Sequence, residues 1–303
     1  MAMKVMVFDV EHGACAFVKT PTNHTILIDC GCTEGFSPAL HIAKHELGTA
    51  AGWSGKELTW MVITHPHDDH ITEVEAIKEA CPPALLTRQQ YDWEEVKTAE
   101  DGDYDNLDTY TKWQATYNQP IVLYPDLGLK FERFMLSPAE AKAIDKAKFI
   151  NNSSIVIVLT VTGTAGKKHQ EKFLFGGDME TAGWEALLKK EDFRNAVKGV
   201  DFFITSHHGH KSGFSQALFD AMGSRPPIVN IVSIHHNDDS KDERYGQPEY
   251  ALGANVNNTE RRMLTTRSDG TITVWVNDEG EFWITTAHLA DNKPEKLARY
   301  VAV

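Results

Sequence analysis

The feature that most constrains this chain is a cluster of metal-binding side chains at the end of one apolar segment. Residues 58–64 are typical of a buried strand and lead into the string His65-Pro66-His67-Asp68-Asp69-His70. Neutral imidazoles and carboxylates are the side chains that hold zinc and related divalent ions. Alternation along an extended segment sends His65 and His67 to one side, while Asp69 and His70 enter the turn beyond. The string therefore predicts a site for two neighbouring metals at a sheet edge.

Two later segments offer further ligands in the same setting. An apolar run at residues 173–175 leads into Gly176-Gly177-Asp178, where the glycines allow a carboxylate to approach closely. A second apolar run at residues 202–204 leads through Thr205 into Ser206-His207-His208-Gly209. Either segment alone is a weak signal, because an aspartate after glycines is most often a turn residue. Together with the first string they supply enough ligands for a dinuclear site.

The order of expected elements favours a mixed α/β fold. Strands are expected at both ends of the chain, and helices alternate with strands between them. The expected helices are residues 37–47, 71–80, 138–148, 181–190 and 214–222; the expected strands are 4–10, 14–20, 25–28, 58–64, 84–86, 121–124, 129–136, 154–162, 172–175, 201–205, 228–234, 271–276 and 281–286. We expect one domain over residues 1–303, built of two mixed sheets covered by helices. The long polar segment at about 88–120 reads as an irregular insertion or lid.

Composition narrows the possible partners. With 30 basic and 43 acidic residues, the net charge of −13 disfavours a general DNA-coating protein, whose affinity comes from neutralising phosphates. A nuclease stays possible, because bound divalent cations reverse the local field. The acidic stretch 91–108 is either a solvated face or a shield against unsuitable substrates.

Location and redox state follow from what the sequence lacks. No apolar run is long enough to cross a membrane, and the N-terminus has no signal-peptide pattern, so we expect a cytoplasmic protein without a membrane partner. The four cysteines form no CxxC pair, and Cys30 and Cys32 are expected to flank a turn rather than to bind metal.

These motifs resemble the metallo-β-lactamase superfamily, which has HxHxDH, then GD, then HHG. The chain looks most similar to the hydrolase domain of ComEC-type DNA-internalisation competence proteins. That narrower resemblance rests on four strings: Phe8-Asp9-Val10-Glu11-His12-Gly13, near the family's DVGxGD but with Glu11 for a glycine and Ala14 for an acid; Ile28-Asp29-Cys30-Gly31; Asn151-Asn152-Ser153-Ser154; and Tyr245-Gly246-Gln247-Pro248, with glutamine where the family has histidine.

The resemblance implies an αβ/βα four-layer sandwich with a dinuclear site between its sheets. It places His65 and His67 on a first metal, places Asp69, His70 and His207 on a second, and makes Asp178 the bridge between them. Asn151 occupies the position of a third histidine on the first metal. Because an amide oxygen is a harder and weaker ligand than imidazole, the ions could be Zn²⁺ or Mn²⁺.

Several other residues are candidates for supporting roles. Asp69 would orient or deprotonate the attacking water, and His208 and Lys211 would assist the developing charge or the leaving group. Lys211 and the backbone amides that open the expected helix 214–222 would form a seat for phosphate. By the resemblance, Asp29 orients the histidine loop. Site roles for His12, His235 and His236 are left open.

The leading interpretation of function is a metal-dependent phosphodiesterase or nuclease, acting on nucleic acid or a small phosphodiester. A hydrolase of small esters, lactones or cyclic nucleotides is the alternative, and it suits the net charge of −13 better. A binding or regulatory protein on the same fold is the third. Protein partners cannot be identified from the sequence.

Overall fold

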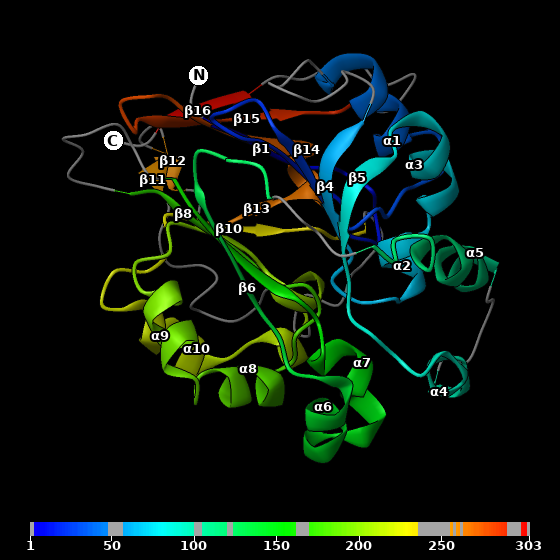
Figure 1. Ribbon diagram of the computed structural model, residues 1–303. Coiled ribbons are helices and arrows are strands. Elements are labelled where there is room, and N and C mark those ends of the chain that lie inside the picture. The colour runs from blue at the N-terminus through cyan, green and yellow to red at the C-terminus, as the bar shows by residue number, and fades with distance from the viewer. Residues whose placement is uncertain are drawn as a thin grey trace.

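Two β-sheets face each other in the computed structural model, and helices cover their outer faces (Figure 1). The structure describes residues 3–47, 57–99, 105–119, 124–161, 170–235, 255–256, 259–260, 263–289 and 298–301. The expected four-layer α/β architecture is confirmed.

The first sheet has eight strands in the order β16-β15-β14-β1-β2-β3-β4-β5. Most neighbours are antiparallel, and only the pairs β3–β4 and β4–β5 are parallel. The strands are β1 (Met3–Val7), β2 (Ala16–Lys19), β3 (Thr25–Ile28), β4 (Leu58–Val62), β5 (Pro83–Thr87), β14 (Thr271–Val276), β15 (Phe282–Ala287) and β16 (Ala298–Val301). The hairpin expected near the C-terminus is confirmed, with Val276 opposite Phe282.

The second sheet has six strands in the order β13-β10-β9-β8-β7-β6. Its strands β8, β9, β10 and β13 run parallel, so their carboxyl ends meet at one edge. The strands are β6 (Lys130–Phe134), β7 (Val156–Thr160), β8 (Lys172–Phe175), β9 (Phe202–Ile204), β10 (Val229–Val232) and β13 (Leu264–Thr265). A separate two-stranded ribbon joins β11 (Asn255–Val256) and β12 (Thr259–Glu260).

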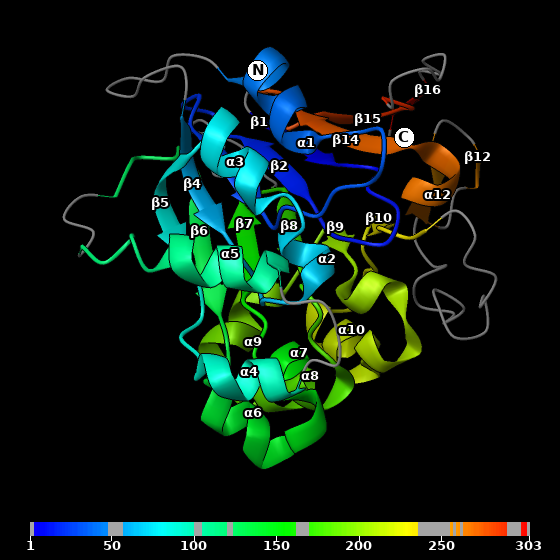
Figure 2. The same cartoon turned by 90° about the vertical axis from the view of Figure 1, so that its right-hand side faces the viewer.

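Helices form the two outer layers (Figure 2). Those on the first sheet's side are α1 (Pro38–His41), the π-helical turn η1 (Ile42–Glu46), α2 (Asp68–Ile71), α3 (Val74–Ala80) and α5 (Asp105–Gln114). Those on the second sheet's side are α6 (Pro138–Ile144), η2 (Lys146–Lys148), α7 (Phe149–Asn152), α8 (Thr181–Leu187), α9 (Glu191–Val197) and α10 (Gln216–Met222). The short helix α12 (Thr266–Asp269) precedes β14.

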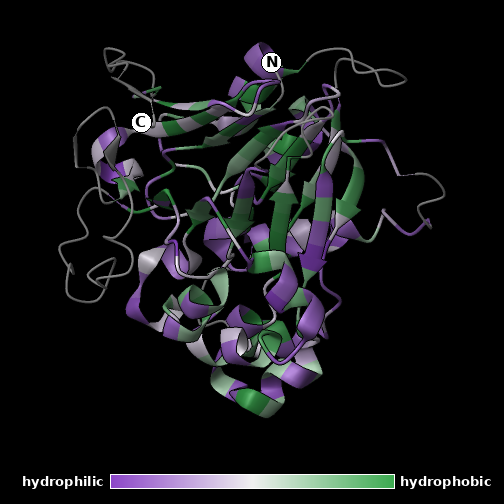
Figure 3. Ribbon diagram, turned by 90° about the vertical axis from the view of Figure 1, so that its left-hand side faces the viewer, coloured by the Kyte–Doolittle hydropathy of each residue, from purple (hydrophilic) through white to green (hydrophobic). Residues whose placement is uncertain are grey.

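Alternation along the strands divides the core into two apolar clusters. In β4, Trp60 and Val62 belong to the cluster between the sheets, whereas Met61, which lies between them in sequence, belongs to the cluster under the helices. Both faces of the strand are buried, which explains its nearly continuous apolar sequence. Figure 3 shows most strands as predominantly hydrophobic, whereas the outer helices carry both hydrophobic and hydrophilic residues. Because the strands are filled with packed apolar side chains, the polar residues of a functional site are expected in the loops at the ends of the strands.

The expectation of an irregular segment at 88–120 was wrong. It contains α4 (Trp93–Ala99) and α5, and α5 buries Leu107, Tyr110 and Trp113 in the helix-side core. Acidic residues between these apolar positions masked the helical period, and the burial of an amphipathic face stabilises the helix. Helix α9 was also not expected, and the expected strand 121–124 lies almost wholly outside the described residues.

Among the described residues, no helix is both long enough and apolar enough to cross a membrane.

Candidate metal centre

The predicted metal-binding residues come together where the two sheets meet. His65 and His67 follow β4, Asp178 follows β8, and His208 follows β9. Two groups of possible ligand atoms form, each with all its atoms within 4.8 Å of one another: His65, His67 and Asp178, and then Asp69, His70 and His208. Three segments far apart in the sequence thus supply one compact set of nitrogen and oxygen donors.

Asp178 lies between the two groups. Its Oδ2 is 3.9 Å from Nε2 of His65, and its Oδ1 is 3.1 Å from Nε2 of His70. Nε2 of His208 lies 3.8 Å from Oδ1 of Asp178 and 3.0 Å from Oδ2 of Asp69. This arrangement allows Asp178 to face both groups, as the position of a bridging ligand requires.

Asp29 fixes the loop that carries the histidines. It accepts hydrogen bonds from the backbone amide of Thr64 (2.7 Å) and from its hydroxyl (2.8 Å), and Nδ1 of His70 lies 2.8 Å from Asp29 Oδ2. With Nδ1 held, Nε2 of His70 points toward Asp178 and Asp69. These contacts are those that the expected positioning role of Asp29 requires, and the role itself stays a prediction.

Two glycines explain why the loop can pack so closely. A Cβ on Gly31 would lie 2.4 Å from the carbonyl oxygen of Asp69, and one on Gly13 would lie 2.8 Å from the same atom. The amide of Ala14 donates to that oxygen at 3.2 Å. The sequence strings containing Gly13 and Gly31 therefore act by holding the Asp69 turn in place.

The carboxylates and imidazoles of the site shift one another's pKa values. Burial alone would lower the pKa of His70, but the carboxylates of Asp178, Asp29 and Asp69 hold this pKa well above its ordinary value. Burial would likewise raise the pKa of Asp178, yet the imidazoles of His70 and His208 hold it well below the usual range. Burial, with His70 nearby, lowers the pKa of His65 well below normal. The carboxylates of Asp178, Asp29 and Asp69 therefore favour positive charge at the centre, which a bound cation would also supply.

The residues present fit a metal ion. Nε2 of His65 is buried and has no hydrogen-bond partner among the described residues, while its Nδ1 lies 3.1 Å from the Thr64 hydroxyl. A buried imidazole nitrogen without a partner is costly unless something else binds it. A divalent ion held by His65, His67 and Asp178 would satisfy this nitrogen.

The second group differs from the sequence expectation in one residue. His208, not His207, lies with Asp69 and His70. Nδ1 of His208 lies 3.2 Å from the carbonyl oxygen of Ser233, which directs Nε2 at the carboxylates. This position suits a ligand better than the expected role in assisting the leaving group. The sequence could not show which of the adjacent residues His207 and His208 joins this group, because that depends on their backbone angles.

Asn151 lies beside the centre in a polar network. Its Nδ2 donates to Oε1 of Glu180 at 3.1 Å, and its Oδ1 is buried with no hydrogen-bond partner among the described residues. Glu180 Oε1 also lies 3.5 Å from Nδ1 of His207. Ligation by Asn151 stays a prediction. Glu180 was not anticipated, because nothing in the string Met179-Glu180-Thr181 marks it.

The rim of the centre carries further titratable groups. Nε2 of His12 lies 3.8 Å from Oδ2 of Asp69, and its ring lies 5.0 Å from that of His208. His235 pairs with Glu11 at 3.2 Å. His210, which was not predicted from the sequence, lies 2.8 Å from the Ser212 hydroxyl.

Two predicted features cannot be placed: His236 and the string 245–248 lie outside the described residues.

The expected phosphate seat after His210 is not formed. The amide of Ser212 donates to Nδ1 of His210, that of Gly213 to the His210 carbonyl and that of Phe214 to the Lys211 carbonyl. These residues belong to the turn η4 (Lys211–Gly213), and α10 begins only at Gln216. Lys211 itself is exposed.

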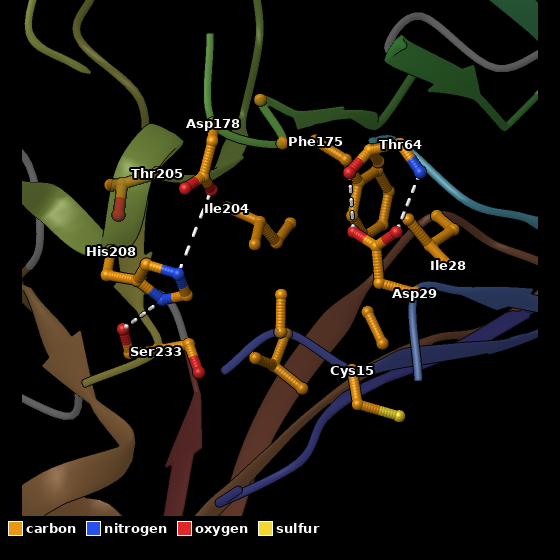
Figure 4. Close-up of a pocket in the computed structure, with 15 residues that line it drawn as sticks. Cys15, Ile28, Asp29, Thr64, Phe175, Asp178, Ile204, Thr205, His208 and Ser233 are labelled. Carbon is orange, nitrogen blue, oxygen red and sulfur yellow. Dashed lines mark hydrogen bonds and ion pairs between the residues drawn. The ribbon is translucent and has the colours of Figure 1, made fainter. Parts of the chain in front are cut away.

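A small cavity of about 30 Å³ lies beneath the centre, between the sheets. Figure 4 shows Asp178 and His208 on one side of it and Asp29 and Thr64 on the other, with the apolar side chains of Phe175, Ile204 and Ile28 among them. The volume holds about one water molecule. The cavity is therefore part of the centre's support and too small for a substrate.

Comparisons with known proteins show which family and which solved structures this chain resembles. The model of the metallo-β-lactamase superfamily matches residues 9–137, and no curated protein sequence matches the chain. Similar solved structures include an isothiocyanate hydrolase from Delia radicum gut bacteria (12% identity, TM-score 0.47, covering 88% of this chain and 97% of that one). A long form RNase Z from yeast is 11% identical, with a TM-score of 0.42, covering 92% of this chain and 41% of that one.

The chain has the fold of the metallo-β-lactamase superfamily, as its sandwich and the match over residues 9–137 show. The narrower resemblance to ComEC-type proteins has no support from these comparisons and stays a prediction.

Proposed function

We propose that this protein is a metal-dependent hydrolase with a dinuclear centre. The observation that carries the proposal is the position of Asp178 between two groups of imidazole and carboxylate donors, with its two oxygens directed at different groups. His65 and His67 would hold one ion, and Asp69, His70 and His208 the other. This donor set favours Zn²⁺, and its carboxylates also admit Mn²⁺.

Two such ions lower the pKa of a water molecule and neutralise the charge that develops on the attacked group. The protein's own residues then orient the reactants. Asp69, held by His208 at 3.0 Å, is placed to accept a proton from the attacking water. His12, half-exposed and 3.8 Å from Asp69, is placed to give a proton to the leaving group at the open side.

A phosphodiester is the first substrate class that we propose, because a pair of ions can clamp both the attacking and the leaving oxygen of such a group. Lys211 is exposed and follows His208 by three residues, so we propose its side chain as a cation for the phosphate, without the backbone seat expected from the sequence. A small neutral ester or lactone is the second candidate. It is favoured by the net charge of −13.

The test is hydrolysis by purified protein loaded with Zn²⁺ or Mn²⁺. Substrates are bis-p-nitrophenyl phosphate, single-stranded DNA, RNA, a lactone and nitrocefin. We expect turnover of at least one class, its loss with EDTA, and its loss in Asp178→Asn. His45→Asn, which changes an exposed histidine outside the centre, is the matched control and should keep full activity. Failure of the wild-type protein to bind metal would overturn the proposal, and hydrolysis of the lactone alone would select the second candidate.

A further inference from the structure

His207 and His208 occupy an unusual backbone conformation. Both have left-handed angles, with φ 52° and ψ 46° at His207 and φ 51° and ψ 32° at His208. Side chains with a Cβ rarely adopt this region, and consecutive examples persist only where the surroundings fix them. The amide of His207 is held by the Gly177 carbonyl at 2.9 Å, so the strained turn is tied to the segment that carries Asp178.

The two side chains reach different oxygens of the centre. Nε2 of His208 is 3.0 Å from Oδ2 of Asp69, in the second group. Nε2 of His207 is 3.9 Å from Oδ2 of Asp178, and Nε2 of His65 lies at the same distance from that oxygen.

This spacing matches that between donors of a recognised group. Within the second group, Nε2 of His70 is 3.9 Å from Oδ2 of Asp69. The separation between His207 and Asp178 thus occurs within a group of possible ligands. Distance alone does not assign a ligand, since His12 lies 3.8 Å from Asp69, but the His207 side chain is only 23% exposed, against 52% for His12.

The other ring nitrogen of His207 is held as it is in the neighbouring ligands. Its Nδ1 lies 2.9 Å from the Ser212 hydroxyl and 3.5 Å from Glu180. His70 uses Nδ1 on Asp29, and His208 uses Nδ1 on the Ser233 carbonyl. A partner at Nδ1 leaves the Nε2 lone pair for a metal. All three imidazoles thus direct Nε2 toward the carboxylates.

We propose that His207 is the third protein nitrogen on the first ion, beside His65 and His67, and that Ser212 positions it. The two adjacent histidines then serve different ions from one strained turn. This inference rests on the proposed dinuclear centre. It also explains how the first ion can be held although Asn151 stands where many proteins of this fold have a histidine: the missing imidazole comes from the loop after β9.

The test is metal binding by His207→Asn, measured without substrate. Asparagine tolerates the left-handed angles of residue 207, so the variant should fold. Metal-free protein is titrated with Co²⁺ or Zn²⁺ at micromolar concentration, and stoichiometry is read by calorimetry and by the visible Co²⁺ spectrum. We expect about two equivalents in the wild type and about one in His207→Asn. Ser212→Ala should keep two equivalents but weaken one of them by roughly 10–100-fold, as loss of such a hydrogen-bond partner does.

A double variant identifies which ion is lost. If the histidines serve different ions, His208→Asn keeps about one equivalent and the double variant keeps neither. His45→Asn, which changes an exposed histidine outside the centre, is the matched control and should keep two. Two unweakened equivalents in His207→Asn would overturn the assignment of His207 while leaving the proposed function intact. A double variant that still binds one ion would show that the histidines share an ion. No binding by the wild type would overturn both proposals.

Discussion

The variant Asp29→Asn tests the residue that orients a proposed ligand while leaving all the proposed ligands in place. Asp29 has φ 59°, and asparagine accepts this left-handed angle as readily as aspartate does, so the backbone should not change. One carboxylate oxygen becomes an NH₂ group. That donor would then face the Thr64 hydroxyl and Nδ1 of His70, both of which now pair with Asp29 at 2.8 Å.

The expected loss can be estimated from these contacts. Removing the group that orients a metal-bound histidine typically costs about 10–100-fold in metal affinity, or about 1.4–2.8 kcal/mol. The metal-free protein should also lose about 1.5–3 kcal/mol of stability, the usual value for a hydrogen bond to a charged group. The second loss should persist in EDTA, whereas the first is visible only in metal binding.

Competition with a chromophoric chelator measures the affinity, and thermal unfolding with and without EDTA measures the stability. Asp126→Asn is the control, since this carboxylate caps only the exposed turn at Gly128. Wild-type metal affinity in Asp29→Asn would refute the positioning role. A loss of stability without any loss of affinity would reduce Asp29 to a purely structural contact.

Three further predictions test other parts of the site and its support. Gly31→Ala should bring a Cβ within 2.4 Å of the Asp69 carbonyl, so we expect about 1–3 kcal/mol lower stability and weaker metal binding, measured by denaturant unfolding and metal titration. Glu73 has a pKa raised by burial, so its ionised form costs stability as pH rises; Glu73→Gln should therefore raise Tm near pH 7, and this gain should shrink at pH 4, where wild-type Glu73 is protonated. Lys211→Ala should raise KM for a phosphodiester roughly tenfold with unchanged metal content; an unchanged KM would make Lys211 a solvated surface charge.

The sequence alone determined the layout of the fold and most of the donor set. The run 58–64 followed by His65-Pro66-His67-Asp68-Asp69-His70 carries its own geometry, because a buried strand and the tight turn after it are local structures. The strings containing Asp178 and the pair His207-His208 could be placed for the same reason, since each follows an apolar strand, although the sequence assigned His207 rather than His208 to the second metal. Such local patterns can be recognised in the sequence without knowledge of the tertiary structure.

Tertiary structure decided which of these groups meet. The left-handed angles at His207 and His208 have no sequence signal, yet they direct the two imidazoles at different carboxylates. The link from Asn151 through Glu180 to His207 joins three separate segments. Helix α5 was hidden in a polar stretch because its stability comes from burying three residues against the core. Each of these three features depends on contacts between segments far apart in the chain. The free energy of those tertiary contacts exceeds the local conformational propensities that can be predicted from the sequence.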